Sequence, residues 1–268
     1  MSATIHPYLE RPPLALAHRG GPEFAPHAGL ENTLAAFVGA ARLGYRYIET
    51  DVHLTADGVL VAFHDEVLDR VTDARGRIAD LPWPRVEQAR VGGREPIPTL
   101  LALLTALPSV RVNIDLKAPR TAPATLAVLR ASGATKRACV GSFSQARLWH
   151  FRWLARRDGV ATSAGRLGIT ALRLLPRAAS RVVHTPGIAY QVPETHAVFG
   201  RRVRVVTPDF VAGAHAIDRQ VHVWTVDDPA QMRRLLDLGV DGIITDRLDV
   251  LAEVLAERGH PLRLPPTP

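Results

Sequence analysis

Short apolar segments alternate with longer amphipathic segments along almost the entire chain. Short apolar runs are typical of buried strands, and amphipathic runs are typical of helices. The pattern weakens between 165 and 206, where we expect only weak strands near Ile188 and Val203. This β-then-α order predicts parallel strands joined by crossover helices, in either an open sheet or a closed barrel. The expected strands are 14–17, 45–50, 59–63, 110–116, 137–141, 160–163, 220–226 and 242–245, and the expected helices are 31–43, 98–107, 121–132, 144–155, 208–216, 229–238 and 248–258.

Polar residues follow the C-terminal ends of many of these expected strands. An open sheet gathers its site near one switch point, whereas a barrel builds its site from the ends of many strands. No Gly-x-Gly-x-x-Gly follows the first strand, which weakens a dinucleotide-binding fold. We therefore predict the α/β class and a (β/α)8 TIM barrel. The residues that favour the barrel are His18, Arg19, Glu49, Asp51, His64, Asp65, Asp115, Lys117, Trp224 and Asp246.

One barrel would use nearly all of the 268 residues, since such barrels run to about 250 residues. We expect an N-terminal extension over 1–13, the barrel domain over 14–258 and a C-terminal tail over 259–268. The segment 66–98 is longer than a usual loop and is expected to form a small cap at the mouth.

Composition limits the classes of function. The formal net charge is +7, but no run of five basic residues and no basic helix interleaved with aromatic residues marks a nucleic-acid binder. The single cysteine, Cys139, cannot form an internal disulfide. The sequence has neither a secretory leader pattern nor an apolar run long enough to span a bilayer. We therefore expect a cytoplasmic protein without stable membrane insertion.

Three carboxylates are candidate metal ligands. Glu49 and Asp51 lie two residues apart on an expected strand, so their side chains point to the same face. Two converging carboxylates repel each other unless a cation or a proton lies between them. With Asp115 at the end of another strand, the oxygen-only set suits Mg²⁺ or Ca²⁺. Pairing with a nearby arginine such as Arg46 is the alternative for Glu49 and Asp51 considered alone.

Two histidines and two basic residues are candidates for acid–base chemistry and phosphate binding. His18 and His64 each end an apolar strand, and two histidines can divide the roles of general acid and general base. Arg19 and Lys117 are suited to hold a phosphate. Trp224 emerges where a strand reaches the mouth and is a candidate wall of a substrate pocket. Each residue taken singly is better explained by a structural role, and only the set together favours a site.

The ordered set of motifs resembles the glycerophosphodiester phosphodiesterase family over residues from about 14 to 255. Each triplet is weak on its own, but the complete order is specific. The matching segments are His18-Arg19-Gly20, Glu31-Asn32-Thr33, Glu49-Thr50-Asp51-Val52, Asp57-Gly58 leading to His64-Asp65, Ile97-Pro98-Thr99-Leu100, Asn113-Ile114-Asp115-Leu116-Lys117, Gly141-Ser142-Phe143, Trp224-Thr225-Val226 and Gly239-Val240-Asp241-Gly242-Ile243-Ile244-Thr245-Asp246.

The resemblance implies hydrolysis of glycerophosphodiesters to glycerol 3-phosphate and an alcohol. It implies a divalent cation, Ca²⁺ or Mg²⁺, bound by Glu49, Asp51 and the acid at 115, and an acid–base pair of His18 and His64. It further implies phosphate contacts from Arg19 and Lys117, with Glu31 and Asn32 supporting the site. The chain departs from the family at Asp115, where glutamate is usual.

Two other functions stay open. A lysophospholipase D or phospholipase C-like lipid phosphodiesterase would need an apolar rim for membrane docking, and no exposed aromatic cluster is evident in the sequence. A non-catalytic barrel that binds phosphorylated ligands or nucleic acid would not need both histidines and all three acids. Small-molecule glycerophosphodiesters are therefore the expected substrates, and nucleic acid is not an expected partner.

Overall fold

Eight parallel strands form a closed barrel. The computed structural model describes residues 6–175, 185–198 and 200–263. Each strand pairs with the next in chain order, β13 returns to β1, and a bridge between Ser163 and Ala189 joins β8 to β9. The predicted (β/α)8 barrel is therefore confirmed. The barrel strands are β1 (Leu14–His18), β2 (Tyr47–Leu54), β6 (Arg111–Leu116), β7 (Ala138–Gly141), β8 (Ala161–Thr162), β9 (Ala189–Pro193), β12 (Gln220–Trp224) and β13 (Gly242–Thr245).

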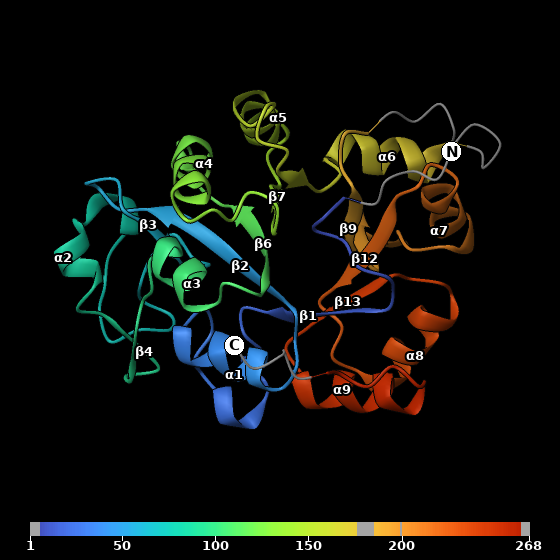
Figure 1. Ribbon diagram of the computed structural model, residues 1–268, viewed down its shortest axis with the longest axis horizontal. Helices are drawn as coiled ribbons and strands as arrows, with labels where there is room; N and C mark the ends of the chain where they lie inside the picture. Colours follow the sequence, from blue (N-terminus) through green and yellow to red (C-terminus); the bar gives the residue numbers. More distant parts are fainter. Residues whose placement is uncertain (1–5, 176–184, 199, 264–268) are drawn as a thin grey trace.

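One main helix follows each barrel strand, and Figure 1 shows these helices arranged around the strands. Their apolar faces pack on the outer face of the barrel and form the largest core cluster. No helix in the described ranges is long and apolar enough to cross a membrane. The helices are α1 (Leu34–Arg42), α3 (Leu100–Ala106), α4 (Thr121–Ala131), α5 (Gln145–Leu154), α6 (Arg166–Leu174), α7 (Pro208–His215), α8 (Pro229–Asp237) and α9 (Leu248–Glu257).

Side-chain caps fix where several helices begin. The Thr33 hydroxyl accepts a hydrogen bond from the Ala36 amide at 3.2 Å and starts α1 three residues later than the amphipathic pattern predicts. Glu31 and Asn32 consequently stay in the loop at the mouth of the barrel. Ser144 caps α5 in the same way.

Two predicted strands are confirmed as strands but lie outside the parallel barrel, and the helices α2 (Trp83–Val86) and α6 were not predicted. The segment β3 (Leu60–Ala62) is not a barrel strand, because it pairs antiparallel with the end of β2. The expected strand near Val203 is β11 (Arg201–Arg204), which pairs with β10 (Thr195–Val198) outside the barrel. The weak strand expected near Ile188 is β9, and α6 lies in the region where the pattern failed.

The segment 66–98 packs around a small apolar core of its own beside β3, at the left of Figure 1. It contains η2 (Ile78–Asp80), α2 (Trp83–Val86), β4 (Arg90–Val91) and β5 (Glu95–Pro96). Its position fits the expected cap, although the proposed domain limits themselves stay a prediction. Residues 1–5 of the extension and 264–268 of the tail lie outside the described residues.

Residues 6–13 lie against the N-terminal ends of β2 and β6. Tyr8 is fully buried, its ring packs edge-on against Tyr47 at 5.4 Å, and the Tyr47 hydroxyl donates to the Tyr8 carbonyl at 2.8 Å. Glu10 forms ion pairs with Arg46 at 2.6 Å and Arg111 at 2.7 Å. The extension therefore closes the end of the barrel opposite to the mouth.

A buried histidine fills part of the barrel interior. His222 of β12 is fully buried, and a Cβ atom at Gly242 would approach its ring to 2.8 Å, which explains the glycine. One ring nitrogen bonds the Gln220 side chain at 2.9 Å. Burial lowers the pKa of His222 to about 4, so the ring is neutral in the folded protein at neutral pH.

His222 should make the folded state less stable in mild acid. The His222 ring has a pKa of 6.5 in the unfolded chain and about 4 in the folded chain. Between these values the unfolded state binds the proton more strongly, so the unfolding free energy falls as the pH falls across this window. We expect the His222 contribution to the unfolding free energy to fall by about 2–3 kcal/mol between about pH 7 and pH 4.5. Urea titrations of the wild type and His222→Gln at both pH values measure this loss. Equal losses in the two proteins would contradict the expectation.

Candidate active site

Three carboxylates meet at the C-terminal end of two neighbouring strands. Glu49 and Asp51 lie on one face of β2, and the register places Asp51 directly beside Asp115 of β6. The Lys117 ammonium lies 2.9 Å from an oxygen of Asp51 and 2.9 Å from an oxygen of Asp115. The predicted acids are therefore brought together, with a protein cation between two of them.

Among these three carboxylates, Glu49 is the one whose negative charge is least well compensated by neighbouring groups. Burial and the neighbouring Asp51 charge raise the pKa of Glu49 to about 8, despite the opposing charges of His18 and Arg19. Its Oε2 atom is buried and has no hydrogen-bond partner among the described residues. Lys117 and Arg19 outweigh the effect of burial at Asp51 and keep the pKa of that carboxyl below its usual range. Glu49 is thus the carboxylate that lacks a compensating partner.

A carboxylate orients the first histidine. The Nδ1–H group of His18 donates to Asp246 Oδ1 at 2.8 Å, and its Nε2 lies 3.8 Å from Glu49 Oε2. Burial would lower the pKa of His18, but the hydrogen bond to Asp246 and the Glu49 charge outweigh it, so the pKa is raised. Asp246 therefore fixes one ring nitrogen and leaves the other facing the site.

The second histidine reaches the site through the antiparallel turn of β3. The Phe63 amide donates to the Asp51 carbonyl at 2.9 Å, which brings the chain back beside β2 just before His64. The His64 Nδ1–H group donates to Asp65 at 2.6 Å, and its backbone carbonyl accepts from His53 at 3.0 Å. His64 therefore carries a carboxylate partner on the same ring nitrogen as His18.

The loop after β1 holds two predicted residues in a left-handed backbone conformation. Arg19 has φ 49° and Asn32 has φ 58°, conformations that most residues with side chains avoid. The Arg19 guanidinium lies 3.3 Å from Asp51, and the Asn32 amide donates to the same carboxylate at 3.4 Å. The Asn32 carbonyl oxygen accepts from Thr50 at 2.7 Å. Both side chains are consequently held against Asp51.

An arginine of the cap joins both sides of the mouth. Arg70 donates to Glu31 at 2.7 and 2.9 Å and to Asp65 at 2.5 Å. The fork geometry makes this a specific link between the loop after β1 and the segment that carries His64. The Arg70 hydrogen bond is also the main reason why the pKa of Asp65 is lowered to about 2. Nothing in the sequence singled out Arg70.

Two aromatic side chains lie at the mouth beside Lys117. Trp224 ends β12 and packs edge-on against Phe143 at 5.6 Å. The Lys117 ammonium lies 5.3 Å from the centre of the Phe143 ring. Phe143 is 60% exposed, so this pair forms an apolar edge beside the charged groups.

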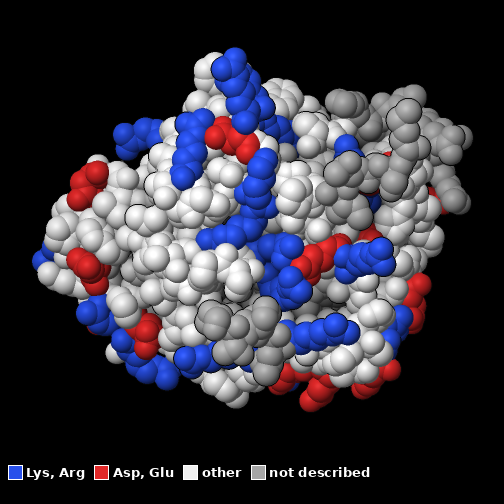
Figure 2. All heavy atoms as spheres, viewed as in Figure 1, with Lys and Arg blue, Asp and Glu red and all other residues white. Residues whose placement is uncertain are grey.

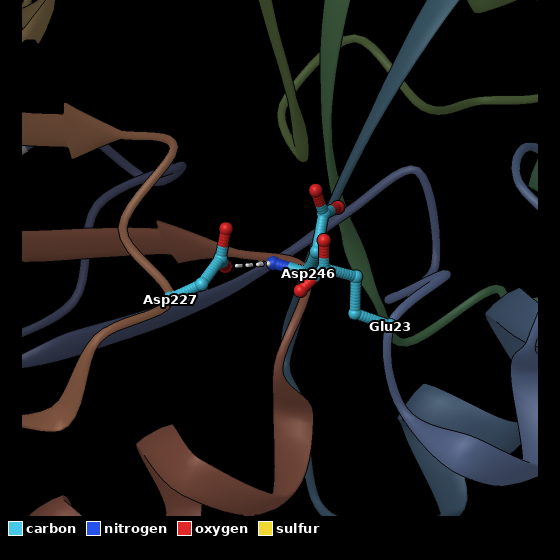
Figure 3. A group of neighbouring side chains, drawn as sticks. All are labelled: Glu23, Asp227 and Asp246. Carbon is cyan, nitrogen blue, oxygen red and sulfur yellow. Dashed lines mark hydrogen bonds between the residues drawn. The ribbon is translucent and has the colours of Figure 1, made fainter.

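A second acidic group lies next to His18. Oxygen atoms of Glu23, Asp227 and Asp246 all lie within 4.8 Å of one another, a spacing that could hold a metal ion (Figure 3). Asp227 accepts hydrogen bonds from the Asp246 amide and the Thr245 hydroxyl, each at 2.8 Å. The predicted ligands Glu49, Asp51 and Asp115 do not form such a compact trio within the described structure.

The contacts join all of the predicted site residues into one network at the mouth. The additional members that sequence reasoning did not assign to the site are Asp246, Asp65 and Arg70. Asp246 directly follows β13 and Asp65 directly follows His64, so position after a strand was a signal for both. The catalytic and binding roles of the predicted residues stay predictions. The predicted residues that the network contains are His18, Arg19, Glu31, Asn32, Glu49, Asp51, His64, Asp115, Lys117 and Trp224.

Fold and site together define a TIM barrel with a carboxylate–histidine site at its mouth. Residues 18–250 match the model of the glycerophosphoryl diester phosphodiesterase family. The Mycobacterium tuberculosis protein named "Probable glycerophosphodiester phosphodiesterase 2" is 44% identical over 250 residues, which cover 92% of each chain. This chain therefore belongs to the glycerophosphoryl diester phosphodiesterase family.

Solved structures agree with the fold. A glycerophosphodiester phosphodiesterase of Agrobacterium tumefaciens has a TM-score of 0.71 at 26% identity, with 88% of this chain and 98% of that chain covered. A phosphodiesterase of Oleispira antarctica, solved with its product sn-glycerol-3-phosphate, has a TM-score of 0.74 at 23% identity. That comparison covers 91% of this chain and 97% of the other and bears on the fold alone.

Proposed function

We propose that this protein hydrolyses glycerophosphodiesters to glycerol 3-phosphate and an alcohol. The observation that carries the proposal is the pair of carboxylate-bound histidines at the mouth that holds three converging acids, in a chain of this family. A divalent cation, Ca²⁺ or Mg²⁺, is part of the proposal, and the choice between them stays a prediction. A cytoplasmic location likewise stays a prediction.

The donor set fits a hard divalent cation. Glu49 offers a buried oxygen without a hydrogen-bond partner among the described residues, and its raised pKa reflects a charge that the protein does not offset. Asp51 and Asp115 supply further oxygens, as such cations prefer. When bound, the cation would polarise phosphoryl oxygens and stabilise their developing charge. Asp115 is one methylene shorter than the glutamate usual at this position and is held by Lys117.

Side chains of the protein would carry out the proton transfers and offset the charge of the phosphate. Asp246 and Asp65 each accept from Nδ1 of a histidine, which leaves Nε2 of His18 and His64 available for proton transfer. One histidine would take a proton from the nucleophile, and the other would protonate the departing alkoxide. The nucleophile is water or the neighbouring glycerol hydroxyl, the latter giving a cyclic phosphate first. Arg19 and Lys117 would offset negative charge on the phosphate.

The substrate class is tested with purified protein. Release of glycerol 3-phosphate from glycerophosphocholine and glycerophosphoethanolamine is measured in EDTA, Mg²⁺ and Ca²⁺. Release of lysophosphatidic acid and choline from lysophosphatidylcholine is measured at the same phosphate concentration. Cation-dependent release from the soluble diesters supports the proposal. Turnover restricted to the lysolipid would replace it with a lysophospholipase D activity.

Asp246 should act through His18. We expect Asp246→Asn to lower kcat by about 10- to 100-fold for glycerophosphocholine with little change in KM, since the asparagine amide no longer fixes the productive tautomer. If His18 is the general acid, a substrate with a p-nitrophenolate leaving group should be affected much less, because that group leaves without a proton. Equal losses for both substrates would assign His18 to the base. An unchanged kcat for both would contradict the positioning role.

A further inference from the structure

Basic residues are concentrated in one part of the chain. The segment 117–193 contains 13 of the 33 Lys and Arg residues but only one acid, Asp158, of the 26 Asp and Glu residues. The rest of the chain is therefore net negative, with 20 basic and 25 acidic residues. Asp158 is already paired with Arg130 at 2.8 Å. Three consecutive helices, α4, α5 and α6, contain no acidic residue at all.

The same helices expose large apolar side chains. On α5, Trp149 is 54% and Trp153 is 63% exposed; on α6, Leu167 is 61% and Leu174 is 75% exposed. The two tryptophans lie four residues apart and so share one face of the helix. The amino ends of the two helices are in contact, since the Leu167 amide donates to the Gln145 side chain at 3.4 Å.

Arginines border these apolar groups. The Arg156 guanidinium lies 5.1 Å from the centre of the Trp153 ring, and Arg157 beside it is exposed. In Figure 2 the top of the molecule, where Figure 1 places α4 and α5, carries several blue side chains around one small red area, whereas red side chains gather at the lower right near α8 and α9. We call Trp149, Trp153, Arg156, Arg157, Leu167 and Leu174 the α5–α6 surface.

We infer that the α5–α6 surface docks the protein on a lipid bilayer that contains anionic lipids. Tryptophan places an apolar ring and a polar N–H at the membrane interface, leucine enters the acyl boundary, and arginine attracts anionic headgroups. A second copy of the chain fits this surface less well, because a two-fold contact would oppose the same arginines. Nucleic acid would account for the arginines but not for the exposed leucines.

Only the amino end of α5 lies at the mouth of the barrel. Phe143 immediately precedes the Ser144 cap of α5 and packs against Trp224 and Lys117 at the mouth. Trp153, Arg156 and Arg157 lie toward the opposite end of the barrel, where His6 donates to the Gly159 carbonyl at 3.1 Å, so docking through α5 and α6 would place the side of the barrel on the bilayer. The inference about docking rests on surface composition and stands apart from the proposed catalytic function.

Vesicle co-sedimentation of the full chain tests the inference. Vesicles of phosphatidylcholine are compared with vesicles in which about one third of the lipid is phosphatidylglycerol. Wild type, Trp149→Ala/Trp153→Ala and Arg156→Glu/Arg157→Glu are measured beside a control at the carboxyl end of α1, Arg42→Glu/Leu43→Ala, which changes an exposed arginine and an exposed leucine away from the α5–α6 surface. Melting curves and turnover of soluble glycerophosphocholine verify that each variant is folded.

We expect the wild type and the control to bind the anionic vesicles, with binding weakened about tenfold or more in both test variants. We also expect brominated phosphatidylglycerol to quench wild-type tryptophan fluorescence, a measurement that needs no variant. Failure of the wild type to bind anionic vesicles would overturn the inference. So would a dimer in light scattering that Trp149→Ala/Trp153→Ala converts to a monomer, or retention on single-stranded DNA without vesicle binding.

Discussion

Replacement of His64 or His18 by alanine should lower kcat for glycerophosphocholine by about 10²- to 10⁴-fold, the usual contribution of a positioned general acid or base. Each ring has its Nδ1 bound to a carboxylate, at 2.6 Å for His64 and 2.8 Å for His18, so each is oriented before substrate arrives. KM should change less than kcat, because proton transfer acts on the transition state.

His215 provides a matched control. It also has a carboxylate partner, Asp241 at 2.8 Å, but this pair lies at the beginning of β13, away from the mouth. His215→Ala should therefore leave kcat within about threefold of wild type at a pH and temperature where the variant is folded. A turnover of His64→Ala or His18→Ala that equals that of His215→Ala would remove the histidine concerned from the mechanism.

Replacement of Lys117 by methionine should make the stability of the barrel depend on a divalent cation. The Lys117 ammonium is shared between Asp51 and Asp115, and its removal leaves two largely buried carboxylates beside Glu49. Breaking such a pair costs about 3–5 kcal/mol. We expect a loss of about 3 kcal/mol in EDTA, because Arg19 still faces Asp51. This loss corresponds to a fall of about 6–12 °C in Tm.

Added Ca²⁺ or Mg²⁺ should restore part of that Tm, since the cation would bind the freed carboxylates in the folded state alone. The only other lysine, Lys136, gives the control, because its ammonium donates to the backbone carbonyl of Asp158 at the surface. Lys136→Met should change Tm little and should not respond differently to the cation than wild type does. Identical melting behaviour of the two variants would contradict the electrostatic account of the site.

The sequence was sufficient for the barrel and for the residues that meet at its mouth. Glu49 and Asp51 could be placed together because side chains alternate along a strand, and the C-terminal ends of parallel strands meet at one end of a barrel. The ordered motifs indicated the family, and the family match confirms it. The position of Asp115 beside Asp51 depended on register, which local pattern does not specify.

Other features depended on contacts between distant segments. The strand before His64 was assigned to the barrel, because an apolar run does not show whether a strand is parallel or antiparallel to its neighbour. Its pairing with the end of β2 makes it antiparallel. Arg70 joins Glu31 across 39 residues, and Asp246 joins His18 across 228. Trp149 and Trp153 sit in a helix whose apolar residues suggest burial, and only the folded chain shows them exposed.

The most direct test of the proposed activity is a ³¹P NMR time course of glycerophosphocholine with the purified wild-type protein, first in EDTA and then with Ca²⁺ or Mg²⁺ added. The account predicts no change in EDTA and, with cation, conversion of the diester signal to glycerol 3-phosphate, directly or through a cyclic phosphate. Appearance of phosphocholine would place the cleavage at the other ester bond. A diester signal that persists with every cation would contradict the proposed phosphodiesterase activity.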